Sequence, residues 1–234
     1  MSFLPSVLAV LAAYLIGSLS FAVIVSRGMG LEDPRHYGSG NPGATNVLRS
    51  GHRGAALLTL AFDALKGYVP VLLALVFGPA WGLNETTVSL VGLAAFVGHL
   101  WPLFFGFKGG KGVATAAGVL LALNPWLGAA TLLTWLIIAA FFRYSSLASI
   151  VAALFAPFYQ LLIWGASPAL LAICAMSLLL LWRHQPNLRK LFAGTESRIG
   201  ARPAPSGGPA VKHPVNQHPT HAHPHGHGHR KGHK

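Results

Sequence analysis

The chain has 234 residues, of which 53% are hydrophobic and only 9% are charged. A soluble domain typically carries about 25% charged residues, so these charges are too few to cover a water-facing surface. The composition therefore excludes an ordinary soluble domain and indicates a protein whose main solvent is lipid. The net charge of +12 comes from 17 Lys and Arg against 5 Asp and Glu. In a membrane protein, such an excess orients the chain and binds anionic substrates or lipid headgroups, rather than nucleic acid.

Seven apolar segments are candidates for membrane-spanning helices, since a helix needs about 20 apolar residues to cross the hydrocarbon core. In chain order they are Phe3–Ser26, Gly54–Phe77, Thr86–Phe105, Val113–Leu123, Pro125–Phe142, Leu147–Gly165 and Pro168–Trp182. The first lacks a basic leader and is too long for a signal-peptide core, so we expect a retained helix. The fourth is too short to span alone unless it borrows from its flanks. The sequence predicts an all-α, polytopic membrane bundle of seven transmembrane helices.

Basic residues are confined to alternate connections between these segments. The first set of connections contains Arg27, Arg35, Arg49, Arg53, Lys108, Lys111, Arg143 and the residues from Arg183 onward. No Lys or Arg occurs in the other set, which comprises the N-terminus, Gly78–Glu85, Asn124 and Ala166–Ser167. Because basic connections remain in the cytoplasm, we expect the N-terminus outside, the C-terminus in the cytoplasm and an odd number of helices.

The composition changes near residue 204, where Pro, Gly and His become dominant. Eight histidines lie between His213 and His233. Nothing in this segment can bury a core, so the sequence predicts a membrane-embedded domain over residues 1–203 and a disordered tail over 204–234. Alternating histidines could bind Ni, Zn or Cu weakly. An inert polar or added tail is an equally good explanation.

The connection after the first helix, PRHYGSGNPGATNVLRSGHRG from Pro34 to Gly54, is rich in groups that bind anions. Its glycines match G-x-G-x-x-G, but a membrane helix precedes them and Pro42 stands where the phosphate-binding helix should begin, which excludes a dinucleotide fold. Glycine still lets the backbone aim N–H groups at an anion, and Arg49 offers a fork suited to phosphate. A flexible loop touching lipid headgroups is the alternative. The candidate binding residues are Ser39, Gly40, Asn41, Thr45, Asn46 and Arg49.

The second motif is GHLWPLFFGFKGGKGVAT, from Gly98 to Thr115. Its glycine spacing does not fit a P-loop, and no acidic metal ligand is evident. What remains is a glycine-rich turn leading into a helix N-terminus, where unpaired N–H groups and the helix dipole attract anions. Lys111, flanked by glycines, is the stronger candidate for a phosphate contact, whereas Lys108 could instead anchor the loop at the interface. Gly109, Gly110 and Gly112 complete the candidate set.

Two further motifs lie in the remaining basic connections. RYSSLAS, from Arg143 to Ser149, places three serines at a helix start. Ser145 and Ser146 could cap that helix, whereas Ser149 lies further along and is harder to explain as a cap. HQPNLRKLFAGTE begins at His184, which could be an acid/base group or an orienting donor, although a lone interfacial histidine is commonly neither.

One pair of opposite charges lies inside the second apolar segment. Asp63 and Lys66 are three residues apart, which places them on one face of a helix. Intramembrane ions are costly and are usually paired. We therefore expect a buried ion pair near the cytoplasmic side, since a proton relay would need a further member.

Together these motifs resemble the bacterial glycerol-3-phosphate acyltransferases that use acyl phosphate, the PlsY family. The resemblance spans roughly Met1 to Ile199 and rests on GSGNPGATNVLR, on GHLWPLFFGFKGGKGVAT, on the serine motif and on His184, Asn187, Gly194 and Glu196. Gln185 and Lys190 depart from the family pattern, in which arginine is usual. Both departures lie in the last motif, and the other motifs carry the resemblance to the family.

The resemblance implies a seven-helix enzyme of the bacterial inner membrane, with its active site at the cytoplasmic face and no metal or cofactor. It would transfer a fatty acyl group from acyl phosphate to the 1-hydroxyl of glycerol 3-phosphate, the first acylation of phospholipid synthesis. We expect Lys111 and the glycine turn to hold acyl phosphate. Glycerol 3-phosphate would be held by Arg49, Ser39, Ser149, His184 and Asn187.

Two other classes remain as alternatives. A membrane carrier for a phosphorylated small molecule could use glycine-broken helices, but carriers usually show repeated halves and polar groups at mid-membrane, and no internal repeat is visible here. A metal-binding membrane protein would rest on the histidine-rich tail alone.

Overall fold

The computed structural model describes residues 3–200, and every regular element in this range is a helix. The α-helices are α1 (Leu4–Gly17), α2 (Phe21–Gly28), α3 (Ala44–Arg49), α4 (Arg53–Phe77), α5 (Glu85–Leu100), α6 (Val113–Leu123), α7 (Pro125–Phe142), α8 (Ser145–Trp164), α9 (Pro168–Arg183) and α10 (Gln185–Phe192). Two 3₁₀ turns, η1 (Gly78–Trp81) and η2 (Leu103–Phe105), extend α4 and follow α5. The predicted tail lies outside the described residues.

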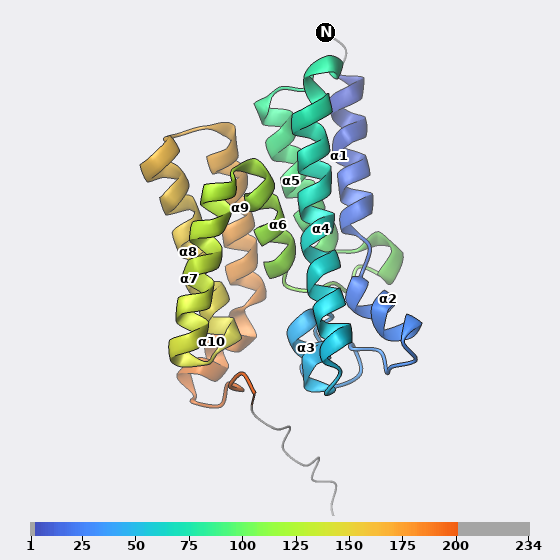
Figure 1. Ribbon diagram of the computed structural model, residues 1–234, viewed down its shortest axis with the longest axis vertical. Coiled ribbons are helices and arrows are strands. Elements are labelled where there is room, and N and C mark those ends of the chain that lie inside the picture. The colour runs from blue at the N-terminus through green and yellow to red at the C-terminus, as the bar shows by residue number, and fades with distance from the viewer. Residues whose placement is uncertain (1–2, 201–234) are drawn as a thin grey trace, which may run out of the picture. The chain divides into compact units, whose positions relative to one another are not determined.

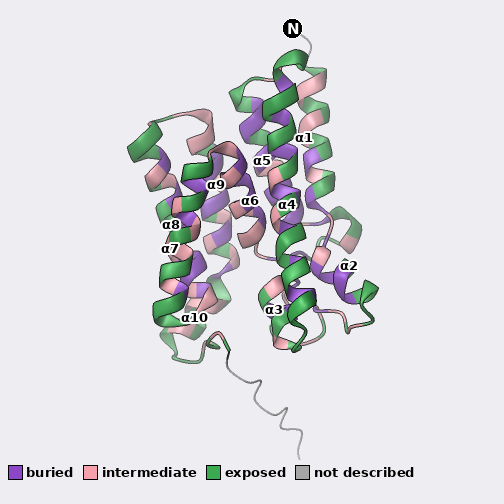
Figure 2. Ribbon diagram, viewed as in Figure 1, coloured by how far each residue is buried: buried purple, intermediate pink, exposed green. Residues whose placement is uncertain are grey.

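The long helices run alongside one another, as Figure 1 shows. Helix α1 packs on α5, α4 packs on α6, and α7 packs on α8. Because α6 contacts both α4 and α7, it joins the α4 side of the bundle to the pair of α7 and α8. Buried residues line the surfaces where helices meet, and exposed residues cover the outward surfaces (Figure 2). Those outward surfaces carry large apolar side chains such as Leu57, Phe141 and Leu171. Apolar residues both inside and outside are expected of a bundle that is surrounded by lipid.

Four helices in the described residues are long and apolar enough to cross a membrane: α4 with η1, α5 with η2, α7 and α8. Two bent pairs, α1 with α2 and α9 with α10, raise the possible number of spans to six. Helix α6 has only 11 residues and falls short, as its sequence suggested. The all-helical, multi-pass architecture is therefore confirmed. Seven spans and the orientation of the termini remain predictions.

The first apolar segment is not one continuous helix, so the prediction of a single helix over Phe3–Ser26 was wrong. Helix α1 ends at Gly17, α2 begins at Phe21, and their axes differ by 45°. Two side chains satisfy backbone carbonyls near the break: the Ser18 hydroxyl donates to Tyr14 O at 2.9 Å, and Lys66 Nζ donates to Leu19 O at 2.7 Å. Tyr14 O also accepts the Ser18 N–H, whereas Leu19 O accepts no backbone N–H within residues 3–200. The break is tolerated because Lys66 supplies the partner that the Leu19 carbonyl lacks.

Small residues allow the backbones to approach closely, as the four-residue spacing of Ala9, Ala13 and Gly17 suggested. A Cβ atom on Gly17 would overlap the carbonyl oxygen of Ala95, so α1 and α5 touch backbone to backbone there. Gly118 of α6 lies in the same way against Ala64 of α4.

The predicted ion pair within α4 is confirmed. Lys66 Nζ lies 2.7 Å from Asp63 Oδ1, and both side chains are almost fully buried. His99 of α5 adds a group that the sequence did not reveal, with its Nδ1 3.6 Å from the same Asp63 oxygen. The Thr115 hydroxyl donates to the backbone oxygen of Asp63 at 2.9 Å and lies 3.2 Å from His99 Nδ1. This cluster ties α4, α5 and α6 together directly behind the glycine turn.

Candidate active site

The side chains of three sequence motifs form one hydrogen-bonded chain. The Lys111 ammonium donates to Asn187 Oδ1, and Asn187 Nδ2 donates to Glu196 Oε1 at 2.8 Å. The same Glu196 oxygen accepts a hydrogen bond from the Ser146 hydroxyl at 2.8 Å. The start of α6, the first turn of α8 and the segment after α10 are therefore held at one place.

The first motif reaches this place through Thr45. Its hydroxyl lies 3.4 Å from the Ser145 hydroxyl, and either oxygen can be the donor. Thr45 belongs to α3 and Ser145 begins α8, so this contact joins segments 100 residues apart. All four motifs thus meet at one side of the bundle, as the alternation of basic connections predicted.

The glycine turn before α6 is pressed against the C-terminal end of α5. A Cβ atom on Gly109 would overlap the carbonyl oxygens of His99 and Leu100, and one on Gly110 would overlap the His99 ring. Gly112 has a φ of +83°, which lies in the left-handed region that favours glycine. These glycines are therefore required by close packing and backbone conformation, besides any role in binding.

The backbone of this turn leaves a group of amides for a ligand. The Gly110 N–H donates to His99 O at 3.2 Å and is therefore occupied. Within the described residues, the amides of Lys111 and Gly112 and of the first three residues of α6, Val113 to Thr115, make no hydrogen bond. Unpaired amides at a helix N-terminus form a site for anions, because the helix dipole also favours negative charge there.

Lys111 carries its charge at the start of this amide group. Burial lowers the pKa of its ammonium to about 8, while Glu196 opposes that shift and the cations Arg49, Arg183 and Lys190 reinforce it. An excess of nearby cations over anions favours the binding of phosphate groups. Arg49 is thus within electrostatic range of Lys111, and its guanidinium makes no hydrogen bond or ion pair within residues 3–200.

The loop of the first motif is built around Asn46, which is almost fully buried. Its Oδ1 accepts the Ser39 N–H at 2.9 Å, and its Nδ2 donates to the carbonyls of Pro34 and Tyr37. Gly38, with a φ of +59°, has no room for a Cβ atom beside Asn46 Oδ1. Asn46 therefore shapes the loop with all of its side-chain donors in use. The loop in turn presents Ser39 and Gly40, both exposed.

A second cationic feature borders the glycine turn. Lys108 and Gly109 line a cavity of about 330 Å³ with Gly40 and Pro42 of the first motif and with Arg35 and His36. Arg35 is already engaged by Asp33 through two contacts of 2.9 and 2.7 Å, and this hydrogen bonding lowers the pKa of Asp33 to about 2. Asn41 lies beside Gly43 at the edge of this loop.

The serines of the third motif differ in what they contact. Neither Ser145 nor Ser146 caps α8, whose N-cap residue is Tyr144. Ser149 is buried; its hydroxyl donates to Ser145 O at 2.8 Å and accepts from Trp135 Nε1 at 3.0 Å. The Ser149 hydroxyl thus has one acceptor position left.

His184 is buried at the bend between α9 and α10, where its Nδ1 lies 2.8 Å from Leu180 O. Because a carbonyl oxygen only accepts, Nδ1 must carry the proton, and Nε2 of the neutral ring is an acceptor.

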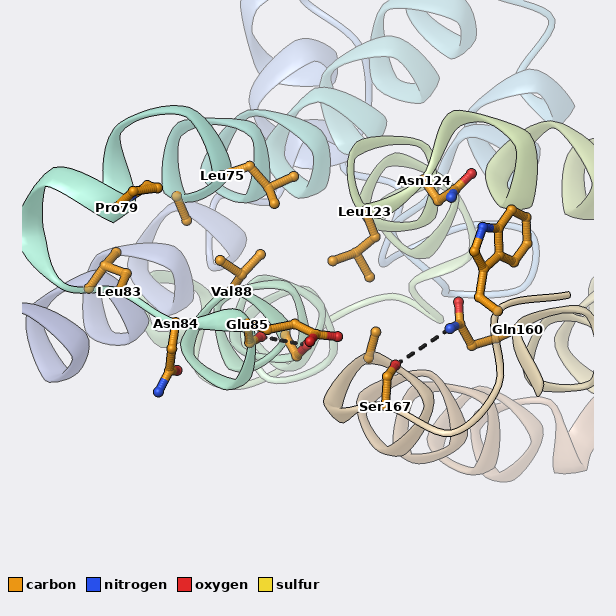
Figure 3. Close-up of a pocket in the computed structure, with 14 residues that line it drawn as sticks. Leu75, Pro79, Leu83, Asn84, Glu85, Val88, Leu123, Asn124, Gln160 and Ser167 are labelled. Carbon is orange, nitrogen blue, oxygen red and sulfur yellow. Dashed lines mark hydrogen bonds between the residues drawn. The ribbon is translucent and has the colours of Figure 1, made fainter.

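A larger cavity of about 580 Å³ lies beyond the other end of α6, lined by Leu123, Asn124, Gln160 and Ser167 among others (Figure 3). Its lining contains none of the candidate residues of the four motifs.

Comparison with known proteins identifies the family. The sequence profile of the family described as Glycerol-3-phosphate acyltransferase matches residues 7–194. This chain belongs to the glycerol-3-phosphate acyltransferase family. The match covers the first three motifs completely and most of the fourth.

Curated relatives carry the same name. The acyltransferase of Ralstonia nicotianae is 63% identical over 195 residues, which are 83% of this chain and 94% of that protein. That of Herminiimonas arsenicoxydans is 61% identical over 199 residues, covering 85% of this chain and 97% of that protein.

Solved structures also match this acyltransferase. The crystal structure of PlsY, an integral membrane glycerol 3-phosphate acyltransferase, in its glycerol 3-phosphate form aligns with a TM-score of 0.78 and 38% identity, over 84% of this chain and 96% of that one. The lysophosphatidic acid form aligns with a TM-score of 0.77 and 37% identity. The resemblance proposed from the four motifs is therefore confirmed, and the chain is a multi-pass membrane acyltransferase.

Sequence reasoning missed two side chains that organise the site of this acyltransferase. Arg183, in the last turn of α9, donates three hydrogen bonds to the carbonyls of Gly109 and Gly110, at 2.7 to 3.1 Å. Glu196 links Ser146 with Asn187. Glu196 could have been chosen as the one acidic residue among the four motifs, whereas the sequence carries no sign of the partners of Arg183. Residues 3–200 contain no cluster of three or more His, Cys, Asp or Glu able to hold a metal.

Proposed function

We propose that this acyltransferase moves a fatty acyl group from acyl phosphate to the 1-hydroxyl of glycerol 3-phosphate, giving lysophosphatidic acid and inorganic phosphate. The observation that carries the proposal is the convergence of the four motifs on Lys111, beside unpaired amides and surrounded by cations. Both substrates bear phosphate, so the reaction needs two neighbouring anion pockets. The forms in which PlsY was crystallised contain glycerol 3-phosphate and lysophosphatidic acid, the acceptor and product of this reaction.

The reaction needs little chemistry from the protein. Acyl phosphate is a mixed anhydride, so its acyl carbon is already activated. The glycerol hydroxyl oxygen attacks that carbon, the carbon–oxygen bond to phosphate breaks, and the departing phosphate takes the hydroxyl proton. Neither an acyl-enzyme nor a cofactor is needed. Positioning and stabilisation of the phosphate charge then supply the rate enhancement.

Each of the two phosphate pockets contains a different set of the candidate residues. Lys111, Lys108 and the turn of Gly109, Gly110 and Gly112 hold the acyl phosphate, where the free amides and the α6 dipole face the anion. Arg49 holds the phosphate of glycerol 3-phosphate with its guanidinium fork. The acceptor, glycerol 3-phosphate, is also held by Ser39, Ser149, His184 and Asn187. Asn187, which contacts Lys111, lies where the two pockets meet.

The sequence lacks a histidine–aspartate pair that could act as a base, which is consistent with acyl phosphate as the acyl donor. Acyltransferases that use acyl-CoA or acyl carrier protein commonly carry H-x-x-x-x-D, and neither Asp33 nor Asp63 has histidine five residues before it. His184 Nε2 can accept a hydrogen bond from the acceptor hydroxyl and orient it.

The active site lies at the cytoplasmic face of the bacterial inner membrane in this proposal. The alternation of basic connections supports the assignment, because all four motifs lie in the basic set. The same rule places the N-terminus outside, with seven crossings if the short α6 crosses with its flanking turn.

The test is to incubate the purified protein with palmitoyl phosphate and glycerol 3-phosphate and to measure both products. We expect equimolar phosphate and lysophosphatidic acid, and no product from palmitoyl-CoA. Phosphate release without acylated glycerol would contradict the proposal. Flux of glycerol 3-phosphate into proteoliposomes without consumption of acyl phosphate would support the carrier alternative instead.

A further inference from the structure

Arg183 lies behind the glycine turn and holds it by the backbone. Its Nη2 donates to Gly109 O at 2.7 Å and to Gly110 O at 3.0 Å, and its Nε donates to Gly110 O at 3.1 Å. The guanidinium therefore uses three of its five N–H groups on two consecutive carbonyls. These contacts join the last turn of α9 to a turn 73 residues earlier in the chain.

Because the peptide unit is planar, the contact with Arg183 also sets the direction of the N–H groups that face the candidate anion pocket. In a trans peptide the C=O and the following N–H point in opposite directions. The Gly109 carbonyl faces Arg183, and the N–H of the same peptide unit, that of Gly110, donates to His99 O on the other side. The Gly110 carbonyl also faces Arg183, so the Lys111 N–H is directed away from Arg183. That N–H makes no hydrogen bond within residues 3–200.

The turn is thus fixed between two elements. The C-terminal end of α5 supports it through His99 O, and the absence of Cβ atoms on Gly109 and Gly110 permits this close approach. Arg183 closes the other side. A turn rich in glycine would otherwise sample many backbone conformations, so its amides would have no fixed direction.

We propose that Arg183 is a positioning residue that orients the glycine turn, so that the Lys111 amide and ammonium point together at the phosphate of the acyl donor. This inference rests on the proposed function, because it assigns the donor to the glycine turn. Arg183 acts on the donor phosphate through the turn rather than by contact with it. Replacing Arg183 should therefore change the KM for the acyl donor and kcat, and should change the KM for glycerol 3-phosphate much less.

Two simpler roles would place the same charge here. A cation in the last turn of α9 could merely balance the helix dipole, or it could contact phosphate directly. A lysine would serve both of these purposes, since an ammonium is also a good phosphate ligand. A lysine ammonium also has three N–H groups, but they diverge from a single nitrogen. Only the planar fork of arginine can aim Nε and Nη2 together at Gly110 O while Nη2 also donates to Gly109 O.

The experiment compares four variants of the full-length protein in palmitoyl phosphate and glycerol 3-phosphate titrations. We expect Arg183→Lys and Arg183→Ala to lower kcat/KM for palmitoyl phosphate at least about tenfold, with the KM for glycerol 3-phosphate changed less than about threefold. Millimolar guanidinium should restore part of the Arg183→Ala activity, because it fills the vacated space. Arg183→Met fills that space with an apolar chain and should not be rescued. Arg189→Ala, an exposed arginine of α10, is the matched control and should behave as wild type.

The outcomes separate the possibilities. Wild-type kinetics in Arg183→Lys would overturn the inference in favour of a simple charge, and so would a loss confined to the KM for glycerol 3-phosphate. Should Arg183→Ala fail to fold, Arg183→Lys decides, since it keeps the charge and most of the side-chain length. A wild-type protein that does not consume palmitoyl phosphate would instead refute the proposed function, and the donor-positioning role of Arg183 would fall with it; an active wild type with unaffected Arg183 variants would refute the role of Arg183 alone.

Discussion

Lys111 and Asn187 are 76 residues apart in the chain, and the ammonium of the first donates a hydrogen bond to the side-chain oxygen of the second. Asn187 is held in turn by Glu196, which also binds Ser146. The cation of the second motif therefore has a defined position before any substrate arrives. Preorganisation of this kind contributes to catalysis because no reorientation is needed as the phosphate charge develops.

Replacing Arg49 should mainly weaken binding of the acceptor. We expect Arg49→Ala to raise the KM for glycerol 3-phosphate about 10- to 100-fold, since a charge-assisted hydrogen bond contributes about 1.5–3 kcal/mol. Steady-state kinetics with each substrate varied in turn measures this. Arg53→Ala removes an exposed arginine four residues away and is the control. An unchanged KM for glycerol 3-phosphate in Arg49→Ala would remove Arg49 from the acceptor pocket.

The pH dependence of activity should report the charge of Lys111. Its pKa is lowered to about 8, chiefly by burial, so the ammonium is present below that pH and is lost as the pH rises through it. We therefore expect kcat/KM for acyl phosphate to fall above about pH 8. In Lys111→Arg the side chain stays charged, so the remaining activity should lack this decline. An identical alkaline decline in both proteins would assign it to another group.

The buried ion pair of α4 should be a stability element. Asp63→Ala leaves the Lys66 ammonium buried without its partner, which we expect to cost about 3–5 kcal/mol. Thermal unfolding in detergent should show the loss, with Glu85→Ala, an exposed acidic residue, as the control. The double replacement of Asp63 and Lys66 by Ala should cost less than the sum of the single changes. Additive losses would show that the two charges do not interact.

Close packing of α1 on α5 depends on Gly17. Gly17→Ala places a methyl group against the Ala95 carbonyl, and overpacking of this kind costs about 1–3 kcal/mol. Gly28→Ala is the matched control, because a Cβ atom there meets nothing within 4 Å. A lower unfolding temperature for Gly17→Ala alone is the expected result. Equal unfolding temperatures would mean that the helices separate at little cost.

Much of this arrangement was predictable because lipid imposes simple rules on sequence. Apolar length located the helices, and the Asp63–Lys66 pair followed from the cost of a lone charge in lipid. The break after Gly17 was missed because residues 18–20 contain no proline or charge to interrupt the apolar segment. The side chains that stabilise the break include the distant Lys66. The partners of Arg183 were missed for the same reason, since backbone carbonyls leave no trace in a residue pattern.

The roles of the glycines illustrate a second limit. Their spacing indicated a phosphate-binding turn, yet Gly109 and Gly110 also fit against α5, and Gly38 makes room for Asn46. A glycine that permits packing and one that permits ligand approach look alike in sequence.

Lys111 and its neighbouring amides bind the phosphate of the acyl donor in the proposed mechanism. The most direct measurement is the initial rate of phosphate release from palmitoyl phosphate, in the presence of glycerol 3-phosphate, by wild type and by Lys111→Met. We predict a rate at least about 100-fold lower for the variant, with an unfolding temperature close to that of wild type. A folded Lys111→Met protein that releases phosphate at the wild-type rate would contradict the account.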